Sequence, residues 1–363
     1  MINKMLVGFI EDGRHSGIDK YLLGFCKVAS ENGVTLDFLT NEISPDMLSY
    51  LKNLGFGLFE IPSLKKPISQ YRIIKKIIKN GSYDAVYFNI SEAFNCMGLL
   101  AAKHCNIPVR IAHSHSSGVD RSNKYVRTIR TVLHRIFRHC LSVWSTRRLA
   151  CSSVAGNWMF DKEYEIVYNA VNKERFVYNE DVRRLTRDKL LLSDEKTFIH
   201  IGHFCYQKNN FFLMDIMKEV LKKDKNAVLL SVGTGADFGA VRDYAKKLGI
   251  DRNVRFLGVR DDVPDLLCAA DVFVFPSRFE GLGIVCIEAQ FSGLPCIVST
   301  AIPKEAKISD KISFLPSGNA KMWAETVVNI LSARKPAMIN KDALLNYDIN
   351  KSKEQLISIM KGK

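Results

Sequence analysis

Short apolar runs rich in β-branched and aromatic residues alternate along the whole chain with longer segments of helical periodicity. This alternation is typical of βαβ units and a mostly parallel sheet. We therefore expect an α/β protein with two Rossmann-like domains and a ligand site in a central cleft between them. The candidate strands are MLVGFI, TLDFLT, LFEIP, DAVYFN, VRIAHSH, RLACS and EIVYN in the first half, and FIHIG, AVLLSVG, VRFLG, DVFVFP and PCIVS in the second.

Length and composition bound the class of protein. A chain of 363 residues suits two domains, and 47% hydrophobic with 25% charged residues is ordinary for a globular protein. No apolar run approaches the roughly 20 residues that span a bilayer, and charge interrupts the first residues too early for a signal peptide. Nine cysteines without CxxC or CxxH spacing indicate reduced thiols in a cytoplasmic protein and no zinc site.

The formal net charge of +14 leaves three kinds of partner open, namely an anionic membrane, a phosphate-rich substrate and nucleic acid. No nucleic-acid-binding module or aromatic platform is recognisable, which weakens the third. Asp-x-Asp occurs nowhere, so a divalent-metal site for a diphosphate is not indicated. We expect neither a metal nor an organic cofactor.

The segment from Asp271 to Ser299, DVFVFPSRFEGLGIVCIEAQFSGLPCIVS, predicts a strand, a tight loop, a helix over 284–292 and a second strand. Glu280 and Glu288 bracket the loop Gly281-Leu282-Gly283 and lie on either side of seven residues. Glycines allow the backbone to approach a ligand, and amides at the start of the helix can donate hydrogen bonds to it. Two carboxylates beside such donors suit a polyhydroxylated molecule such as a sugar. The alternative is a capping acid at Glu280 and a solvated helix face at Glu288.

These residues resemble the Glu-x7-Glu signature of the retaining GT-B glycosyltransferases of family 4. The sequences GLGIV, IEAQ and GLPCI are similar to those of the branch that assembles capsular and exopolysaccharides. The resemblance implies that Glu288 binds the ribose of a nucleotide sugar and that Glu280 binds hydroxyls of the transferred sugar. The loop amides of Gly281, Leu282 and Gly283 would hold sugar or phosphate. It also implies that a helix over 346–363 crosses back to the first domain. The joint is expected between about Asn169 and Leu192, where residues 172–188 are polar and charged, so we expect domains over 1–172 and 173–345.

In the first domain, VRIAHSHSS predicts a strand that carries His113 and His115 to its carboxyl end on one side of the chain. The resemblance implies that a histidine here reaches the donor sugar, and which of the two does so stays open. No third ligand at useful spacing supports a metal. RHSGID resembles the family's Gly-Gly-x-Glu loop, with Gly17 in place, Ser16 for the first glycine and Asp19 for the acid. An ordinary strand-to-helix turn is the alternative.

In the second domain, FIHIGHFCYQKNN places Gly202 after a strand and Lys208 six residues later, where an ammonium can face a diphosphate. The family usually carries an arginine where this chain has His203, and neutral histidine is a weaker counter-ion. The resemblance also implies donor contacts at two further loops, the glycine turn at Gly233 and the base-cradling loop at Val259 and Arg260.

Residues 121–148 hold eight Lys or Arg and no Asp or Glu, with apolar residues at helical spacing. This pattern predicts an amphipathic helix with a basic face that could lie on an anionic membrane. A second basic stretch runs from Lys65 to Asn80 in the same domain. The alternative is an apolar stripe packed on the sheet and a solvated basic face. The candidate membrane or acceptor residues are Lys75, Lys76, Arg127, Arg130, Arg135 and Arg138.

Taken together, these features predict a retaining, metal-independent transfer of a hexose-type sugar from a nucleoside-diphosphate sugar, with UDP-sugar favoured. The expected acceptor is a lipid-linked glycan at the inner face of the cytoplasmic membrane, where the protein would be peripheral. Glu280, Lys208 and one of His113 and His115 would carry the reaction. The alternatives are a non-catalytic glycosyltransferase-like partner subunit, suggested by His203, and, with less support, a nucleic-acid-binding protein.

Overall fold

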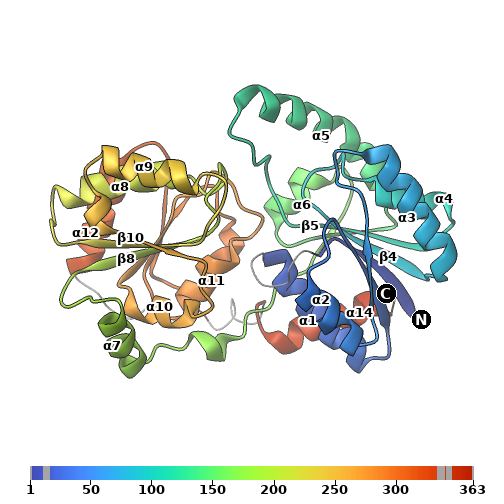
Figure 1. Cartoon of the computed structure of the whole chain (residues 1–363), viewed down its shortest axis with the longest axis horizontal. Coiled ribbons are helices and arrows are strands. Elements are labelled where there is room, and N and C mark those ends of the chain that lie inside the picture. The colour runs from blue at the N-terminus through green and yellow to red at the C-terminus, as the bar shows by residue number, and fades with distance from the viewer. Residues whose placement is uncertain (1, 11–16, 333–339, 341–345, 362–363) are drawn as a thin grey trace. The chain divides into compact units, whose positions relative to one another are not determined.

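The computed structural model describes residues 2–10, 17–332, 340 and 346–361 (Figure 1). The chain divides into two compact units. The first contains residues up to Val119, Tyr125–Ala170 and the chain from Ile349, and the second contains Asp120–Lys124 and Val171–Asp348. We expected a domain boundary after residue 172, and the structure divides the two units after Ala170. The boundary expected after residue 345 lies outside the described residues. The short segment Asp120–Lys124 was expected in the first domain.

The first unit is built on a parallel sheet, which has seven strands in the described part of the chain, in the order β3-β2-β1-β4-β5-β6-β7. Each strand coincides with a predicted apolar run, and most of β1, β2 and β4 is buried because helices cover both faces. The strands are β1 Lys4–Gly8, β2 Thr35–Thr40, β3 Gly57–Glu60, β4 Ala85–Ile90, β5 Val109–Ser114, β6 Arg147–Ala150 and β7 Glu165–Ile166.

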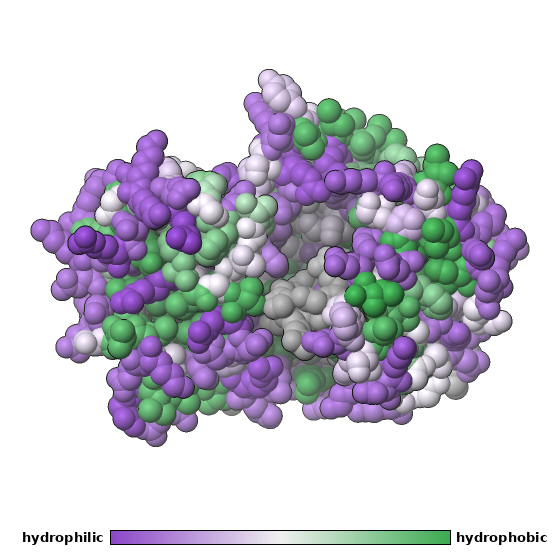
Figure 2. Space-filling view, in the orientation of Figure 1, coloured by the Kyte–Doolittle hydropathy of each residue, from purple (hydrophilic) through white to green (hydrophobic). Residues whose placement is uncertain are grey.

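Four helices of the first unit pack on one face of this sheet (Figure 1). Side chains such as Ile74, Leu99 and Leu141 form the shared core between them and the strands. In Figure 2 hydrophobic residues nonetheless lie along the outer side of α5, at the upper edge of the view. The helices are α3 Pro67–Gly81, α4 Met97–His104, α5 Lys124–Trp144 and α6 Ser153–Met159.

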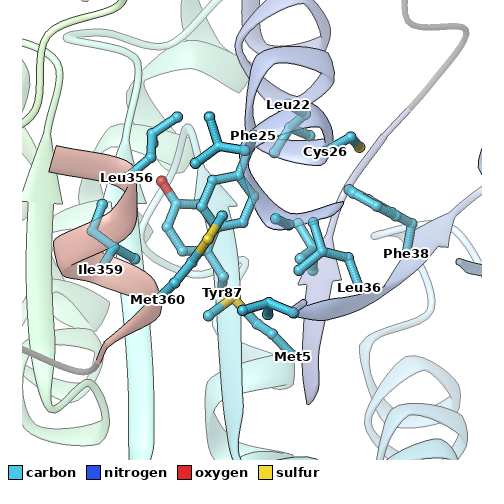
Figure 3. Packing of buried hydrophobic residues seen from close by; sticks show 14 of the residues in the cluster. Met5, Leu22, Phe25, Cys26, Leu36, Phe38, Tyr87, Leu356, Ile359 and Met360 are labelled. Carbon is cyan, nitrogen blue, oxygen red and sulfur yellow. The ribbon is translucent and has the colours of Figure 1, made fainter. Parts of the chain in front are cut away.

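The opposite face of the sheet is covered by α1 Gly17–Glu31, α2 Pro45–Asn53 and α14 Ile349–Met360. Helix α14 comes from the end of the chain and lies beside α1. Figure 3 shows Leu356, Ile359 and Met360 of α14 directed toward Tyr87 and the α1 residue Phe25. The last described helix therefore belongs to the core of the first unit.

The second unit repeats the plan with a parallel sheet in the order β10-β9-β8-β11-β12-β13. Its strands are β8 Thr197–Ile201, β9 Val228–Val232, β10 Val254–Gly258, β11 Val272–Phe275, β12 Cys296–Ser299 and β13 Ile312–Leu315. Its α-helices are α7 Glu180–Lys189, α8 Asn210–Leu221, α9 Phe238–Lys247, α10 Val263–Ala269, α11 Ile284–Phe291 and α12 Ala320–Ser332. Short 3-10 turns occur at Lys173–Phe176, Asp251–Asn253 and Lys304–Ala306. The α/β fold of two Rossmann-like units is as predicted.

Candidate functional site

Glu280 and Lys208 meet at the carboxyl end of the second sheet. Glu280 follows β11 and is 5% exposed, and Lys208 lies in the loop between β8 and α8, two elements that flank it in the chain. Its Nζ lies 2.6 Å from Glu280 Oε1, and Gln207 Nε2 donates to Glu280 Oε2 at 3.0 Å. Strands β8 and β11 are neighbours, which explains why residues 72 positions apart meet. Sequence reasoning selected both charges but missed Gln207.

Backbone hydrogen bonds hold the loop that carries Lys208. Phe204 N donates to Thr234 O at 2.9 Å, Arg278 N donates to Gln207 O at 2.7 Å, and Gln207 N donates to Asp120 Oδ1 at 2.9 Å. The loop is therefore fixed to the turn after β9, to the loop after β11 and to the segment at Asp120. A loop fixed in this way presents the Lys208 ammonium in a defined place.

The predicted glycines Gly202 and Gly233 lie against each other. Gly233 has φ +126°, and a Cβ built on it would be 2.1 Å from Gly202 O, so only glycine fits. Gly202 N in turn donates to Val232 O at 3.0 Å. The Lys208 side chain lies against Gly202, since a Cβ built on Gly202 would be 3.3 Å from Lys208 Cδ.

The loop Gly281-Leu282-Gly283 leads into α11, which begins at Ile284 as predicted. Gly283 stands at the N-cap with φ +80°, a conformation that favours glycine. Glu288 lies on α11 and is only 8% exposed, so it is not the solvated helix residue of the alternative interpretation. Gln290, which the sequence did not single out, accepts from Ile308 N and Ser309 N and donates to Ala306 O. It ties the segment after β12 to α11.

His113 and His115 lie at the carboxyl end of β5 with ring centroids 3.9 Å apart, on the same side of the chain as predicted. His113 is fully buried, and its Nδ1 shares a hydrogen bond with the Tyr87 hydroxyl, which bonds to Tyr21 at 2.9 Å. Within the described residues, His113 Nε2 makes no hydrogen bond. His115 is partly exposed, and its Nε2 lies 2.9 Å from Asn89 Oδ1.

Burial determines the charge of both histidines. It lowers the pKa of His115 to about 3 and, with help from the neighbouring His115, holds the pKa of His113 well below its ordinary value. Both rings are therefore neutral near pH 7, and they can exchange hydrogen bonds but cannot act as cations. His115 is the histidine with an accessible edge, because His113 lies behind it.

The remaining predicted donor residues are described within their own units. His203, which stands in the usual place of an arginine, is exposed. Val259 is exposed as well, and Arg260 donates from Nε to its near neighbour Asp262 at 2.8 Å. Gly17 is the first residue of α1 and Asp19 in that helix is buried, whereas Ser16 lies outside the described residues.

Two of the six basic residues expected on a solvent-facing surface point inward. Arg130 on α5 forms an ion pair with Glu92, and Arg138 donates to Asn157 O at 2.8 Å and to Phe160 O. Both side chains are partly exposed, and carboxylate or backbone oxygens hold their guanidinium groups. Their role on a membrane or acceptor face stays a prediction. Lys75 donates to Tyr71 Oη at 3.2 Å. Lys76 and Arg135 are exposed, and Arg127 is partly exposed.

Two further properties of the described residues bear on partners. None of their helices is both long and apolar enough to cross a bilayer. No three of their His, Cys, Asp or Glu side chains gather as a metal site would require.

Known proteins show what the chain is similar to. The model of the family "Glycosyl transferases group 1" matches residues 195–333. An uncharacterized glycosyltransferase of Haemophilus influenzae is 30% identical over 80% of this chain and 79% of its own length. The UDP-Gal:alpha-D-GlcNAc-diphosphoundecaprenol alpha-1,3-galactosyltransferase of Escherichia coli is 26% identical over 75% of this chain and 70% of its own.

The fold has counterparts among solved structures. HepE of Anabaena, solved in complex with UDP and glucose, superposes with a TM-score of 0.78 at 14% identity and full coverage of both chains. At this identity the likeness concerns the fold alone, which is GT-B. Together with the Haemophilus influenzae relative and the match to the family model, it shows that the chain belongs to the group 1 glycosyltransferases.

Proposed function

We propose that the protein transfers a sugar from a nucleoside-diphosphate sugar, with retention of anomeric configuration and without a metal, to a lipid-linked glycan in polysaccharide assembly. The observation that carries the proposal is the buried Lys208 and Glu280 pair beside the Gly281–Gly283 loop. A UDP-sugar is the favoured donor, because HepE was solved with UDP and glucose and the Escherichia coli relative is named for UDP-Gal.

The departing diphosphate is the main problem in such a reaction, since it leaves with two negative charges. Lys208 supplies a fixed positive charge, and the amides around Gly281 and Gly283 supply dipoles at the start of α11. In the absence of donor Glu280 neutralises Lys208 at 2.6 Å. When donor binds, a phosphate shares the ammonium, and Glu280 accepts hydrogen bonds from sugar hydroxyls.

Orientation of the donor falls to neutral groups and to Glu288. Glu288 accepts hydrogen bonds from the ribose, which its place on α11 favours. His115 offers a neutral imidazole with an accessible edge, and Tyr87 and His113 hold the first unit's cluster behind it. No side chain is assigned as a nucleophile, so we attribute the rate to positioning and to charge stabilisation of the leaving group.

The acceptor locates the reaction. The Escherichia coli relative is named for a sugar carried on diphosphoundecaprenol. A membrane-borne acceptor of this chemistry requires the enzyme to work at the bilayer surface. We therefore propose that the protein works on the inner face of the cytoplasmic membrane as a peripheral protein.

The test is a panel of UDP-, GDP-, ADP- and TDP-sugars, read first as a rise in melting temperature and then as transfer to a lipid-linked acceptor. We expect one donor to stabilise the protein, transfer to persist in EDTA, and the product anomer to keep the donor configuration by NMR. Donor binding without any turnover would favour the non-catalytic partner subunit. Loss of transfer in EDTA would contradict the metal-independent mechanism.

A further inference from the structure

Helix α5 turns one stripe of its apolar residues toward solvent, whereas Phe137, Leu141 and Trp144 pack on the core. Ile129 and Ile136 are 61% and 60% exposed. Only three of its side chains are buried, and two of these are polar, His134 and Ser142, beside Leu141. A helix on the surface of a globular protein normally places its apolar stripe on the core. The other large exposed apolar side chains of α5 are Tyr125, Val126, Val132, Leu133 and Val143.

Polar contacts hold α5 in this orientation. His134 Nδ1 accepts from Ala93 N at 3.0 Å, and its Nε2 donates to Trp158 O at 2.9 Å. The His134 ring also stacks on the Trp158 ring at 4.0 Å. Arg130 pairs with Glu92 on one side of His134, and Arg138 bonds to backbone oxygens on the other. The orientation is thus fixed by three polar anchors on one face of the helix.

An apolar stripe held outward in this way marks an interaction surface. From Ile129 to Val143 it spans about 20 Å at 1.5 Å per residue, which fits a helix lying in the plane of a membrane interface. The charge beside the apolar stripe indicates which kind of partner binds there. Arg121, Lys124 and Arg135 are exposed, and residues 121–148 contain no Asp or Glu, so a second copy of α5 would bring like charges together. An anionic bilayer offers the complementary charge.

We propose that α5 docks on an anionic membrane surface by inserting Ile129, Val132, Leu133 and Ile136 among the lipids, with Arg135 toward the headgroups. This inference deepens the proposed function and rests on it in one respect, because a lipid-linked acceptor gives the docking a purpose. It differs from the sequence expectation in what meets the bilayer. The sequence pointed to the basic face, whereas the structure directs the apolar face outward and uses Arg130 and Arg138 as anchors.

The experiment is flotation of the full-length protein with vesicles of phosphatidylcholine alone or with 30% phosphatidylglycerol as a stated probe composition. We expect binding to the anionic vesicles that weakens but persists at high salt, because apolar insertion is not screened. Ile129→Asp/Ile136→Asp should lower the partition coefficient at least about tenfold, since each change removes an apolar side chain that the bound lipids would bury. Arg135→Glu should lower it less and only at low salt.

The matched control is Leu191→Asp. Leu191 is 79% exposed and lies in the second unit, and its φ of +51° suits aspartate. We expect its vesicle binding to equal that of the wild type. Unchanged melting temperatures would show that the α5 variants fold, as expected for exposed positions.

Two outcomes would overturn the inference. One is equal vesicle binding by Ile129→Asp/Ile136→Asp and the wild type. The other is light scattering that shows a dimer for the wild type and a monomer for the same variant. This result would mean that the stripe binds a second copy of the chain. The vesicles contain no glycan lipid and no donor is added, so docking is measured apart from transfer. Vesicle binding without sugar transfer would contradict only the proposed function. Sugar transfer without vesicle binding would contradict only this inference.

Discussion

At the carboxyl end of β5 the first unit buries a neutral cluster, whereas at the carboxyl ends of β8 and β11 the second unit buries an ion pair. In the first, His113, Tyr87 and Tyr21 exchange hydrogen bonds. In the second, Lys208 and Glu280 depend on each other for charge compensation. A neutral cluster tolerates burial as long as its hydrogen bonds are made, but a buried charge also needs its partner or a ligand. The ion pair is therefore both the more fragile cluster and the one ready to receive an anion.

The largest effect is expected from Lys208→Met. It removes the cation that lies 2.6 Å from the buried Glu280, so the free energy of unfolding should fall by about 3 kcal/mol, and turnover should fall at least about 100-fold. Urea unfolding and initial rates measure the two. Adding Glu280→Gln should restore part of the stability and none of the turnover.

The control for this pair is Lys223→Met, because Lys223 and Glu325 form an ion pair at 3.5 Å with both side chains over 40% exposed. An exposed pair contributes less than about 1 kcal/mol. If Lys208→Met cost no more stability than Lys223→Met, the contrast between buried and exposed charge would fail.

The frame of the charged cluster is tested by Gly233→Ala. Its Cβ would collide with Gly202 O at 2.1 Å in a backbone conformation that disfavours alanine, so we expect a loss of about 2 kcal/mol or more and weaker donor binding. Gly239→Ala is the matched change, since Gly239 lies in α9 with open space around it. Helix propensity predicts a slight gain there. Equal melting temperatures for the two variants would contradict the steric argument.

The neutral interior of the first unit predicts a pH dependence. Burial lowers the pKa of His134 to about 4 and that of His115 to about 3. As pH falls through about 6.5, these histidines bind protons in the unfolded chain but stay neutral in the folded protein. The free energy of unfolding should therefore be fully retained above pH 7 and decline toward pH 5, by about 2 kcal/mol for the buried His134 and by less for the partly exposed His115.

His134→Gln isolates one of these histidines, because an amide can accept from Ala93 N and donate to Trp158 O as the imidazole does. Between pH 7 and 5 this variant should lose about 2 kcal/mol less than the wild type in urea unfolding. Identical losses would mean that His134 already carries a proton in the folded protein at pH 5.

The smallest effect is expected from Tyr87→Phe, which removes the hydroxyl between Tyr21 and His113 and keeps the ring. Loss of these hydrogen bonds should cost about 1 to 2 kcal/mol of stability. The melting temperature of the UDP-sugar complex should still rise as much over that of the free variant as in the wild type. A loss of donor binding comparable to that of Lys208→Met would remove the distinction between the two clusters.

Local pattern was sufficient for the strands of the first sheet and for β8 to β12 of the second, but β13 was not among the predicted strands. The apolar runs became parallel strands, and the glycines at 283 and 293 bound α11 with positive φ. These features follow from short-range sterics and from the burial of a strand on both faces, which one stretch of sequence records. The Glu-x7-Glu stretch was likewise readable, because its spacing and its flanking strands lie within one βα unit.

Tertiary structure decided which groups meet and which face is buried. Lys208 and Glu280 are joined only because β8 and β11 are neighbours, and the sequence did not name Gln207, which donates to Glu280. It also did not name Gln290, which ties the segment after β12 to α11. The sequence did not show which of His113 and His115 is buried, and the structure shows that it is His113, which is bonded to Tyr87. The orientation of α5 shows the reason most clearly, since a helical period is the same whether its apolar stripe faces a sheet or a membrane. Glu92, Ala93 and Trp158 lie far from α5 in the sequence, and their polar groups turned the helix outward.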